Sequence, residues 1–373
     1  MSIAQVAKLA GVSNATVSRV INANPRVAVE TIRSVRKAMQ QLGYSPPVRR
    51  PGPKPLGSRP RPGEAASAAV AFLVIGTSRG RATPGFEELL NGVSAGVSQN
   101  GLTLAFHHVA DPQNLPPRLL EPQQRVDGLL LHGAAPGEAL LERFRDVPTV
   151  WLMRNRSRPR WGDQVAPDGL EIGRLAADYL IDRGHRLLAF LNLDAGHAAL
   201  RMYEHAFTVS AYERDVGVTR LEQARDEREF NGAGYWREPG TEAVSRLVRQ
   251  YLSLVPRPTG LFVAEDMQVA LIQPALQAAG VRVGGAGEVE IISCNREEPY
   301  LFGLQPRPAT IDLRLDSIGR RAVEQLLWRL EHRDVPERVI TTIEPLVVIP
   351  DAAGRPFPRG GRFDDDLPDN GDE

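Results

Sequence analysis

The chain has 373 residues, which is more than one ordinary domain and fewer than four. Apolar residues make up 42% and charged residues 24%, so there is enough apolar material for a sizeable core. The single cysteine excludes a disulfide framework and a zinc site built from several thiolates. No apolar run reaches the roughly 18 residues of a membrane span, and the first residues lack the pattern of a signal peptide. We therefore expect an intracellular, soluble protein.

The charges are unevenly distributed along the chain. Residues 1–62 contain 11 Lys and Arg but only one acid, Glu30, so this segment has a net charge of +10. The remaining 34 basic and 44 acidic residues give residues 63–373 a net charge of −10. A basic segment joined to an acidic one is typical of a nucleic-acid-binding module attached to another domain. A merely solvated basic tail would lack the pattern described next.

The basic segment has the pattern of a helix-turn-helix. Ser2–Gln5 reads as a capping box, apolar residues then recur at helical spacing, and Gly11 ends the helix. Ser13 can cap a second helix, whose inner face carries Val17, Val20 and Ile21. Because only a short turn separates the two helices, they must cross sharply. Apolar positions within residues 32–42 predict a third helix that closes a small core.

The outer face of the second predicted helix carries residue types that read DNA. Arginine pairs with guanine, asparagine pairs with adenine, and small hydroxyls contact phosphates. The residues on this face are Asn14, Ala15, Ser18, Arg19 and Asn22. A lone arginine would more simply be a solvated surface residue, but within this set we expect Arg19 to contact a base.

These residues form part of a dense, ungapped signature, Ala7-x-x-Ala10-Gly11-Val12-Ser13-x-x-Thr16-Val17-Ser18-Arg19-Val20-Ile21-Asn22. The signature resembles the headpiece of LacI/GalR (lactose-repressor-like) transcription regulators, and Leu42-Gly43-Tyr44-x-Pro46 is similar to the exit from that family's third helix. The resemblance implies that Asn14, Ala15 and Arg19 read bases. It also implies that Ser13, Thr16, Ser18 and Asn22 contact the DNA backbone. We assign residues 1–46 to this headpiece.

Residues 47–67 depart from the family's pattern. Relatives have a short hinge helix here that inserts a leucine into the minor groove, whereas prolines 51, 53 and 55 prevent a helix in this chain. One possibility is an extended arm that lies in A·T-rich minor grooves, similar to an AT-hook peptide. The other is a stiff polyproline spacer. The basic side chains of the arm would be Arg49, Arg50, Lys54, Arg59 and Arg61.

From residue 68 onward, apolar strands such as Ala69–Ile75 alternate with helices such as Glu138–Phe144. This alternation predicts parallel sheets covered on both faces. Two such sets, with the signatures Val126-Asp127-Gly128, Gly184-His185-Arg186 and Ala264-Glu265-Asp266, resemble the two-lobed effector domain of the same family. The expected fold is an all-α helix-turn-helix headpiece plus an α/β two-lobed periplasmic-binding-protein-like domain, with two parallel-sheet Rossmann-like lobes.

This domain should span residues 68–350. We expect one lobe at about 68–158 with 315–333, and the other at about 159–312 with 340–349. The Gly/Pro-rich and then acidic residues 351–373 cannot bury a core and should form a disordered tail.

No pattern in the chain assembles a catalytic or metal site. Cys294 has no general base at a fixed spacing, and His107-His108 has no nearby cluster of Cys, Asp or Glu ligands. His185 lies in a predicted turn and reads as structural. We expect no enzyme, no cofactor and no bound metal.

The resemblance implies a cleft between the lobes that binds a small effector, a sugar or another metabolite. By position in the family, the ligand-binding residues would be His132, Arg201, Glu265 and Asn295. Met153 stands where many relatives have an acid, so an acceptor for the vicinal hydroxyls of a sugar is missing there. A residual cleft without a physiological ligand is the alternative.

These observations predict a homodimeric, sequence-specific transcription regulator that represses from a pseudo-palindromic operator on double-stranded DNA. It should act in the cytoplasm, in association with the nucleoid and not with a membrane. A ligand-independent architectural protein on A·T-rich DNA is the main alternative. A solute-binding protein fits poorly with the basic segment, and an enzyme is the weakest alternative.

Overall fold

The computed structural model describes residues 3–21, 29–42, 69–76, 83–110, 126–135, 137–153, 160–223, 240–284 and 287–350. The chain divides into two units, Met1–Glu64 and Ala65–Glu373, which we call the head and the body and describe separately. The predicted capping residue Ser2, the linker 47–67 and the tail 351–373 lie outside the described residues.

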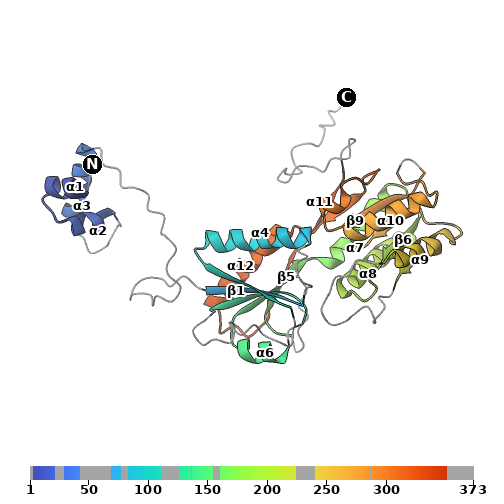
Figure 1. Cartoon of the computed structure of the whole chain (residues 1–373), viewed down its shortest axis with the longest axis horizontal. Coiled ribbons are helices and arrows are strands. Elements are labelled where there is room, and N and C mark those ends of the chain that lie inside the picture. The colour runs from blue at the N-terminus through green and yellow to red at the C-terminus, as the bar shows by residue number, and fades with distance from the viewer. Residues whose placement is uncertain are drawn as a thin grey trace. The chain divides into compact units, whose positions relative to one another are not determined.

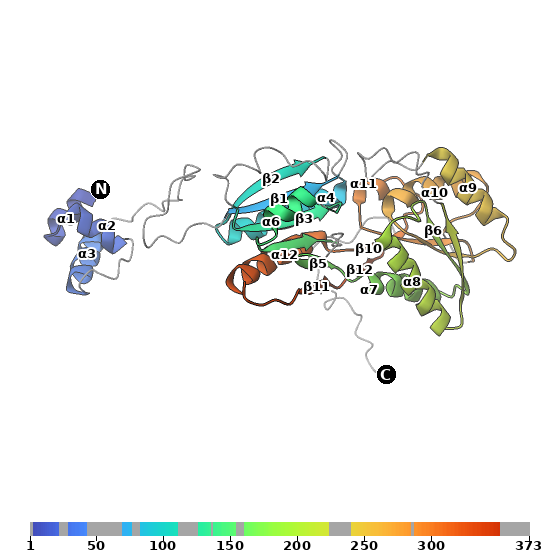
Figure 2. The same ribbon diagram turned by 90° about the horizontal axis from the view of Figure 1, so that it is seen from below.

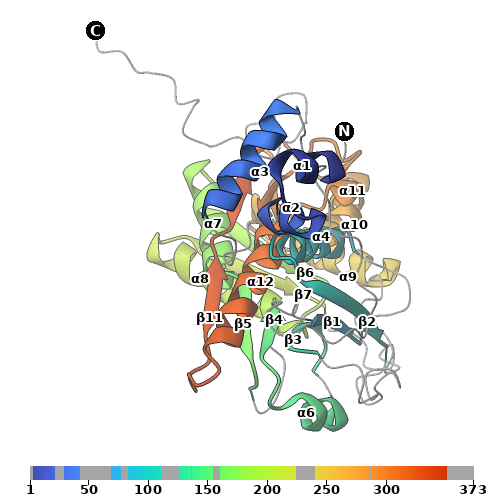
Figure 3. The same cartoon turned by 90° about the vertical axis from the view of Figure 1, so that its left-hand side faces the viewer.

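The described part of the head consists of three helices, α1 (Ile3–Ala10), α2 (Asn14–Ile21) and α3 (Val29–Gln41), drawn in blue in Figure 3. Gly11 ends α1 with a left-handed φ of 68°, a conformation that glycine adopts without steric cost. Buried side chains from all three helices form one small core, namely Val6, Ala7, Val17, Val20, Val35 and Ala38. The predicted helix-turn-helix is confirmed.

The first lobe of the body is a six-stranded sheet with helices on both faces (Figure 1). Its strand order is β11-β5-β4-β3-β1-β2, and its neighbouring strands pair in parallel. The strands are β1 (Ala69–Ile75), β2 (Thr103–Val109), β3 (Gly128–Gly133), β4 (Thr149–Leu152), β5 (Asp163–Pro167) and β11 (Ile340–Ile343). The helices among the described residues of this lobe are α4 (Pro84–Gln99), α6 (Glu138–Phe144) and α12 (Leu315–Glu331).

Both faces of this sheet are buried, as the near-continuous apolar strands predict. Along β1, Phe72 and Val74 belong to the core that includes α4 and α12, while Leu73 and Ile75 belong to the core on the α6 side.

The second lobe repeats this arrangement with the strand order β12-β10-β9-β8-β6-β7. Its strands are β6 (Leu187–Asn192), β7 (Gly217–Glu222), β8 (Gly260–Val263), β9 (Glu290–Cys294), β10 (Ala309–Asp312) and β12 (Leu346–Val348). Its helices are α7 (Gly169–Asp182), α8 (Ala198–Glu213), α9 (Thr241–Leu252), α10 (Asp266–Ala278) and α11 (Glu298–Leu301). Residues of α7 and α8 pack on one face, and residues of α9 and α10 pack on the other. The edge strand β12 pairs antiparallel with β10.

The expected lobe boundaries are wrong at two strands. The structure places β5 and β11 in the first sheet, where they pair with each other, although both were expected in the second lobe. The chain therefore crosses between the lobes after Pro167, after Asp312 and after Ile343. The elements flanking these crossings lie together at the centre of the body in Figure 2. A hydrogen bond joins the first crossing to the third, because the amide of Asp168, just before α7, donates to the carbonyl of Ile343, the last residue of β11, at 2.9 Å.

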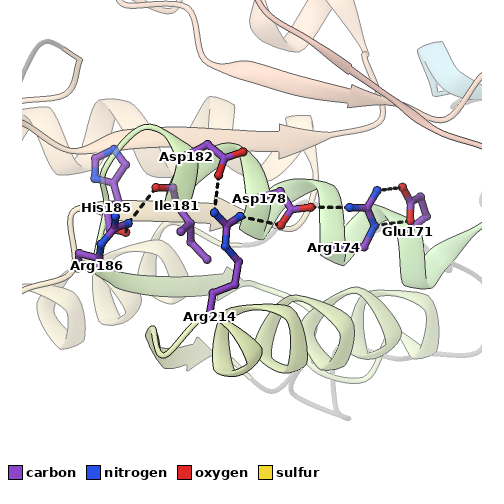
Figure 4. Close-up of polar contacts among 8 residues, drawn as sticks. All are labelled: Glu171, Arg174, Asp178, Ile181, Asp182, His185, Arg186 and Arg214. Atoms are coloured by element: carbon purple, nitrogen blue, oxygen red, sulfur yellow. Dashed lines mark hydrogen bonds and ion pairs between the residues drawn. The ribbon is translucent and has the colours of Figure 1, made fainter.

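A chain of ion pairs follows α7 in the second lobe (Figure 4). Arg174 pairs with Glu171 and Asp178 along the helix, and Arg214 reaches from the end of α8 to Asp178 and Asp182 at 3.1 and 2.6 Å. The hydrogen bond from Arg174 lowers the pKa of Glu171. Because these side chains are partly or largely exposed, water screens each pair, and each contributes little to stability. The buried apolar side chains of α7 and α8 account for most of the stability of their packing.

Candidate functional site

The described surface of the head has the features of a DNA-binding module. Ser13 caps α2, because its hydroxyl oxygen accepts a hydrogen bond from the amide of Thr16 at 3.1 Å. Asn14 is exposed in the first turn of the same helix. Four basic side chains on α1 and α3 are also exposed, namely Lys8, Arg33, Arg36 and Lys37. Exposed basic side chains and a capped helix N-terminus both suit contact with phosphates.

The structure does not test the other predicted DNA contacts. The backbone of α2 includes Ala15, Ser18 and Arg19, but their side chains lie outside the described part of the chain. Asn22 and the linker residues Arg49, Arg50, Lys54, Arg59 and Arg61 also lie outside it. These residues stay predictions from the sequence.

The body contains a cavity of about 600 Å³ that is lined by residues of both lobes. The carboxyl ends of parallel strands supply much of its wall: Gly133 from β3, Leu152 from β4, Pro167 from β5, Glu265 just after β8 and Asn295 just after β9. Ligands of open α/β sheets bind at this end of the strands.

Three of the four predicted ligand-binding residues line this cavity, namely His132, Glu265 and Asn295. Arg201 is not among the lining residues, and its role in ligand binding stays a prediction. Arg201 is exposed on the first turn of α8, where its guanidinium donates to the carbonyls of Ala195 and Gly196 at 3.1 and 2.9 Å. The neighbouring Met202 and Tyr203 of α8 line the cavity instead.

Most of the cavity wall could not be predicted from the sequence. The aromatic side chains Phe86, Tyr203 and Tyr300 line it, together with Met153, Met202 and Met267. Three of the five methionines of the whole chain therefore meet at one site. Their positions are scattered over strands and helices of both lobes, so no spacing in the sequence could reveal their convergence.

The backbone is strained at two positions of the cavity wall. Met153 has a φ of 65° and Asn295 has a φ of 110°, and residues other than glycine rarely adopt such values. Each residue directly follows a strand, β4 or β9, at its carboxyl end. Strain of this kind is concentrated at functional sites.

One buried carboxylate organises the second-lobe side of the cavity. Asp266, at the start of α10, accepts hydrogen bonds from the hydroxyls of Ser293 and Thr310 at 2.5 and 2.8 Å. It also accepts one from the amide of Glu297 at 2.6 Å. Complete burial raises the pKa of Asp266 to about 7, although these hydrogen bonds oppose the shift. Asp266 thus fixes the loop that carries Glu297.

Glu297 in turn connects the two lobes. Its carboxylate accepts a hydrogen bond from the amide of Gly85 at 3.0 Å, in the first turn of α4. A carboxylate at a helix N-terminus is stabilised by the unpaired amides and the helix dipole. Burial raises the pKa of Glu297, which is 6% exposed and lines the cavity. This hydrogen bond therefore joins the two lobes at the wall of the cavity.

The raised pKa of Asp266 makes stability depend on pH. The folded protein retains a proton that the unfolded chain releases, so the wild type should lose stability as pH rises from about 4 to 7. Asp266→Asn lacks this ionisation. The wild type should therefore lose up to about 4 kcal/mol relative to Asp266→Asn across this interval. Urea unfolding at a series of pH values measures the difference. Asp178→Asn, at a more exposed position, is the control, and parallel profiles for the wild type and Asp266→Asn would contradict the prediction.

Among the described residues, no group of three or more His, Cys, Asp and Glu side chains is placed to hold a metal ion. Within the same part of the chain, no helix is both long and apolar enough to span a bilayer.

A helix-turn-helix head and a two-lobed body with a central cavity together define a DNA-binding regulator with a periplasmic-binding-protein-like domain. Residues 2–47 match the profile of "Bacterial regulatory proteins, lacI family", and residues 177–349 match that of a "Periplasmic binding protein-like domain". The chain belongs to the lacI family of transcriptional regulators.

Curated relatives match nearly the whole chain. The HTH-type transcriptional repressor PurR of Mannheimia succiniciproducens is 28% identical over 353 residues, covering 93% of this chain and 97% of the relative. The ribose operon repressor of Escherichia coli K12 is 28% identical over 332 residues, covering 87% of this chain and 92% of the relative. A solved complex of the transcriptional regulator CelR with cellobiose is similar in fold, with a TM-score of 0.58, 21% identity and coverage of 94% and 98%.

Proposed function

We propose that the protein is a sequence-specific repressor that binds a pseudo-palindromic operator as a homodimer and that a small molecule in the cavity modulates this binding. The observation that carries the proposal is the presence, in one chain, of a helix-turn-helix head and a body whose cavity is lined by both lobes. Since one head contacts only a half-site, two heads are needed for tight and specific binding.

The relatives support a non-enzymatic role, because those described above are repressors. We infer that the protein acts in the cytoplasm on the nucleoid, where its operator lies. Asn14, Ala15 and Arg19 would read bases, and Ser13, Thr16, Ser18 and Asn22 would contact phosphates. The linker residues Arg49, Arg50, Lys54, Arg59 and Arg61 would either follow the minor groove or belong to a spacer. Only an arm in the minor groove would add a preference for A·T pairs.

Selection of genomic fragments on the purified full-length chain, followed by DNase footprinting, tests this function. A repressor should protect a few strong sites with two-fold symmetric half-sites. Diffuse protection of A·T-rich DNA would favour the architectural alternative and contradict our proposal.

Arg19→Ala should weaken binding to the selected operator by about 1–3 kcal/mol, because a bidentate contact with guanine is lost. Preference at one base pair of each half-site should relax at the same time. Fluorescence anisotropy on the operator, on single-base variants and on random DNA measures both effects. Lys37→Ala, which removes an exposed charge on α3, is the control and should weaken all DNAs alike. If Arg19→Ala also weakens all DNAs equally, Arg19 contacts only a phosphate.

A further inference from the structure

Three arginines lie near one aspartate at the amino ends of β5 and β11 in the first lobe. Asp163 opens β5, and the guanidinium of Arg329 donates two hydrogen bonds to its carboxylate, at 2.9 and 2.8 Å. Arg160 shortly precedes β5, and Arg338 shortly precedes β11. Because β5 and β11 pair in parallel, Arg160 and Arg338 lie at the same end of the sheet. Asp163 is engaged with Arg329, so these four residues together carry an excess of positive charge.

The turn that carries Arg338 is held in place on both sides. The guanidinium of Arg329 donates to the carbonyls of Val335 and Glu337 at 2.5 and 2.7 Å. The amide of Val339 donates to the carboxylate at the start of β5 at 2.9 Å. The backbone before and after Arg338 is therefore fixed, which limits the positions that its guanidinium can reach.

The side chain of Arg338 has hydrogen-bond donors without acceptors. Its Nε and Nη2 atoms are buried, and no acceptor in the part of the chain that the structure describes lies within hydrogen-bond distance of them. Asp163 attracts this guanidinium from farther away, but its carboxylate already accepts hydrogen bonds from other groups. Burial and the neighbouring charge of Arg160 lower the pKa of Arg338. A negatively charged acceptor would stabilise an arginine in this position.

Arg160 supplies a second guanidinium from a separate segment. The indole of Trp151 on β4 donates to the carbonyl of Trp161 at 3.0 Å, which fixes the backbone next to Arg160. The side chain of Arg160 is exposed and lines the cavity between the lobes. The pair thus combines one guanidinium whose donors are buried with a second one that is accessible from the cavity.

We propose that Arg338 and Arg160 bind a phosphate group of a small molecule. A phosphate has acceptor oxygens on several sides, so two guanidinium groups from different segments can contact it at once, and its charge offsets their repulsion. A single carboxylate has two oxygens in one plane and suits one guanidinium. The source is either free inorganic phosphate or a phosphorylated metabolite whose body extends into the cavity. In the second case the inference rests on the proposed function of the cavity as the effector site.

Thermal unfolding of the purified full-length chain, followed by tryptophan fluorescence, tests this site. All four tryptophans follow residue 150, so the signal reports on the body and not on phosphate bound to the head. At pH 7, about 10 mM sodium phosphate should raise the melting temperature by about 2 °C or more over sodium chloride of equal ionic strength. Sulfate shares the tetrahedral geometry and should act similarly, whereas acetate should not. No difference between phosphate and chloride, or an equal effect of acetate, would overturn the proposal.

Arg338→Gln tests the buried guanidinium. The variant should lose most of the shift caused by phosphate, as expected if its affinity falls about tenfold. Without phosphate it should melt at the wild-type temperature or above, because the removed donors have no acceptor, whereas loss of a structural arginine would lower this temperature. Arg333→Gln, at an exposed position after α12, is the matched control and should change neither result. A full phosphate shift in Arg338→Gln, or a clear loss of stability without phosphate, would contradict the proposal.

Ribose 5-phosphate and ribose distinguish the two sources of the phosphate group. If the ligand enters the cavity, ribose 5-phosphate should bind at least about tenfold more tightly than inorganic phosphate and than ribose. Equal affinities of the two phosphates, both dependent on Arg338, assign the site to free phosphate. Binding of ribose 5-phosphate that is unchanged in Arg338→Gln would contradict the proposal.

Failure of this proposal can be distinguished from failure of the proposed function. If footprinting finds an operator but phosphate has no effect that depends on Arg338, the protein is a regulator and only the phosphate site is wrong. If phosphate binds through Arg338 but no operator is found, the phosphate site stands and the proposed function fails. If Arg338→Gln weakens operator binding and keeps the phosphate shift, Arg338 contacts DNA and the proposal is overturned.

Discussion

Asp163→Ala should destabilise the body by about 3–5 kcal/mol, because it leaves Arg329, whose side chain is 12% exposed, without its counterion. Asp163 is 2% exposed and accepts four hydrogen bonds. The guanidinium of Arg329 supplies two of them, at 2.9 and 2.8 Å, and Gln325 and the amide of Val339 supply the others at 2.9 Å. One carboxylate thus connects β5, α12 and the segment that leads into β11.

Unfolding in guanidinium chloride, followed by tryptophan fluorescence, measures this loss of stability, since Trp151 and Trp161 lie in the same lobe as Asp163. Glu324→Ala is the control on α12, because it removes the partner of Arg321 at 2.8 Å on the surface. The control should cost at most about 1 kcal/mol. Equal losses in the two variants would mean that burial of the Asp163 pair does not set its strength.

Gly92→Ala should destabilise the body by about 3 kcal/mol or more through overpacking. A β-carbon at Gly92 would lie 2.0 Å from the carbonyl oxygen of Asp316 on α12, and Gly319 of α12 makes a similar close approach to α4. The helices would have to move apart, since both obstacles belong to the backbone. Helix propensity alone favours alanine by about 1 kcal/mol, so the sign of the result separates packing from propensity.

Thermal unfolding of Gly92→Ala and Gly217→Ala checks this expectation. Gly217 opens β7, and a β-carbon there would meet no atom within 4 Å. The melting temperature should fall in the first variant and stay nearly constant in the second. A melting temperature of Gly92→Ala at or above the wild-type value would show that α4 and α12 can separate at little cost.

Strongly apolar strands and amphipathic helices could be predicted from the sequence. Ala69–Ile75 and Glu138–Phe144 have the predicted bounds, because an apolar run or an amphipathic period identifies each one locally. β5 and β11 could not be assigned to their sheet in this way. The sequence of β5 is Asp-Gln-Val-Ala-Pro and that of β11 is Ile-Thr-Thr-Ile, both short and polar. Their place is set by partners far away in the chain, such as Arg329 for Asp163.

The residues of the cavity likewise differ in whether they could be predicted from the sequence. His132, Glu265 and Asn295 follow from their positions at strand ends, which a family resemblance can transfer. The position of Glu297 between the lobes could not be predicted from the sequence, because it depends on a hydrogen bond to Gly85, which is 212 residues away in the sequence. Arg201 does not line the cavity, since a matching position on a helix does not fix the direction in which a long side chain extends.

The three crossings between the lobes give the body a mechanical property that neither lobe has alone. Asp168 is the only residue between β5 and α7, Leu313 and Arg314 separate β10 from α12, and Glu344 and Pro345 separate β11 from β12. Relative motion of the lobes must be absorbed by a few backbone torsions, and the ring of Pro345 fixes one of them. Three short connections side by side permit the lobes to bend about a shared axis but oppose sliding and twisting of one lobe against the other. We therefore expect a ligand in the cavity to move the lobes by rotation about this axis.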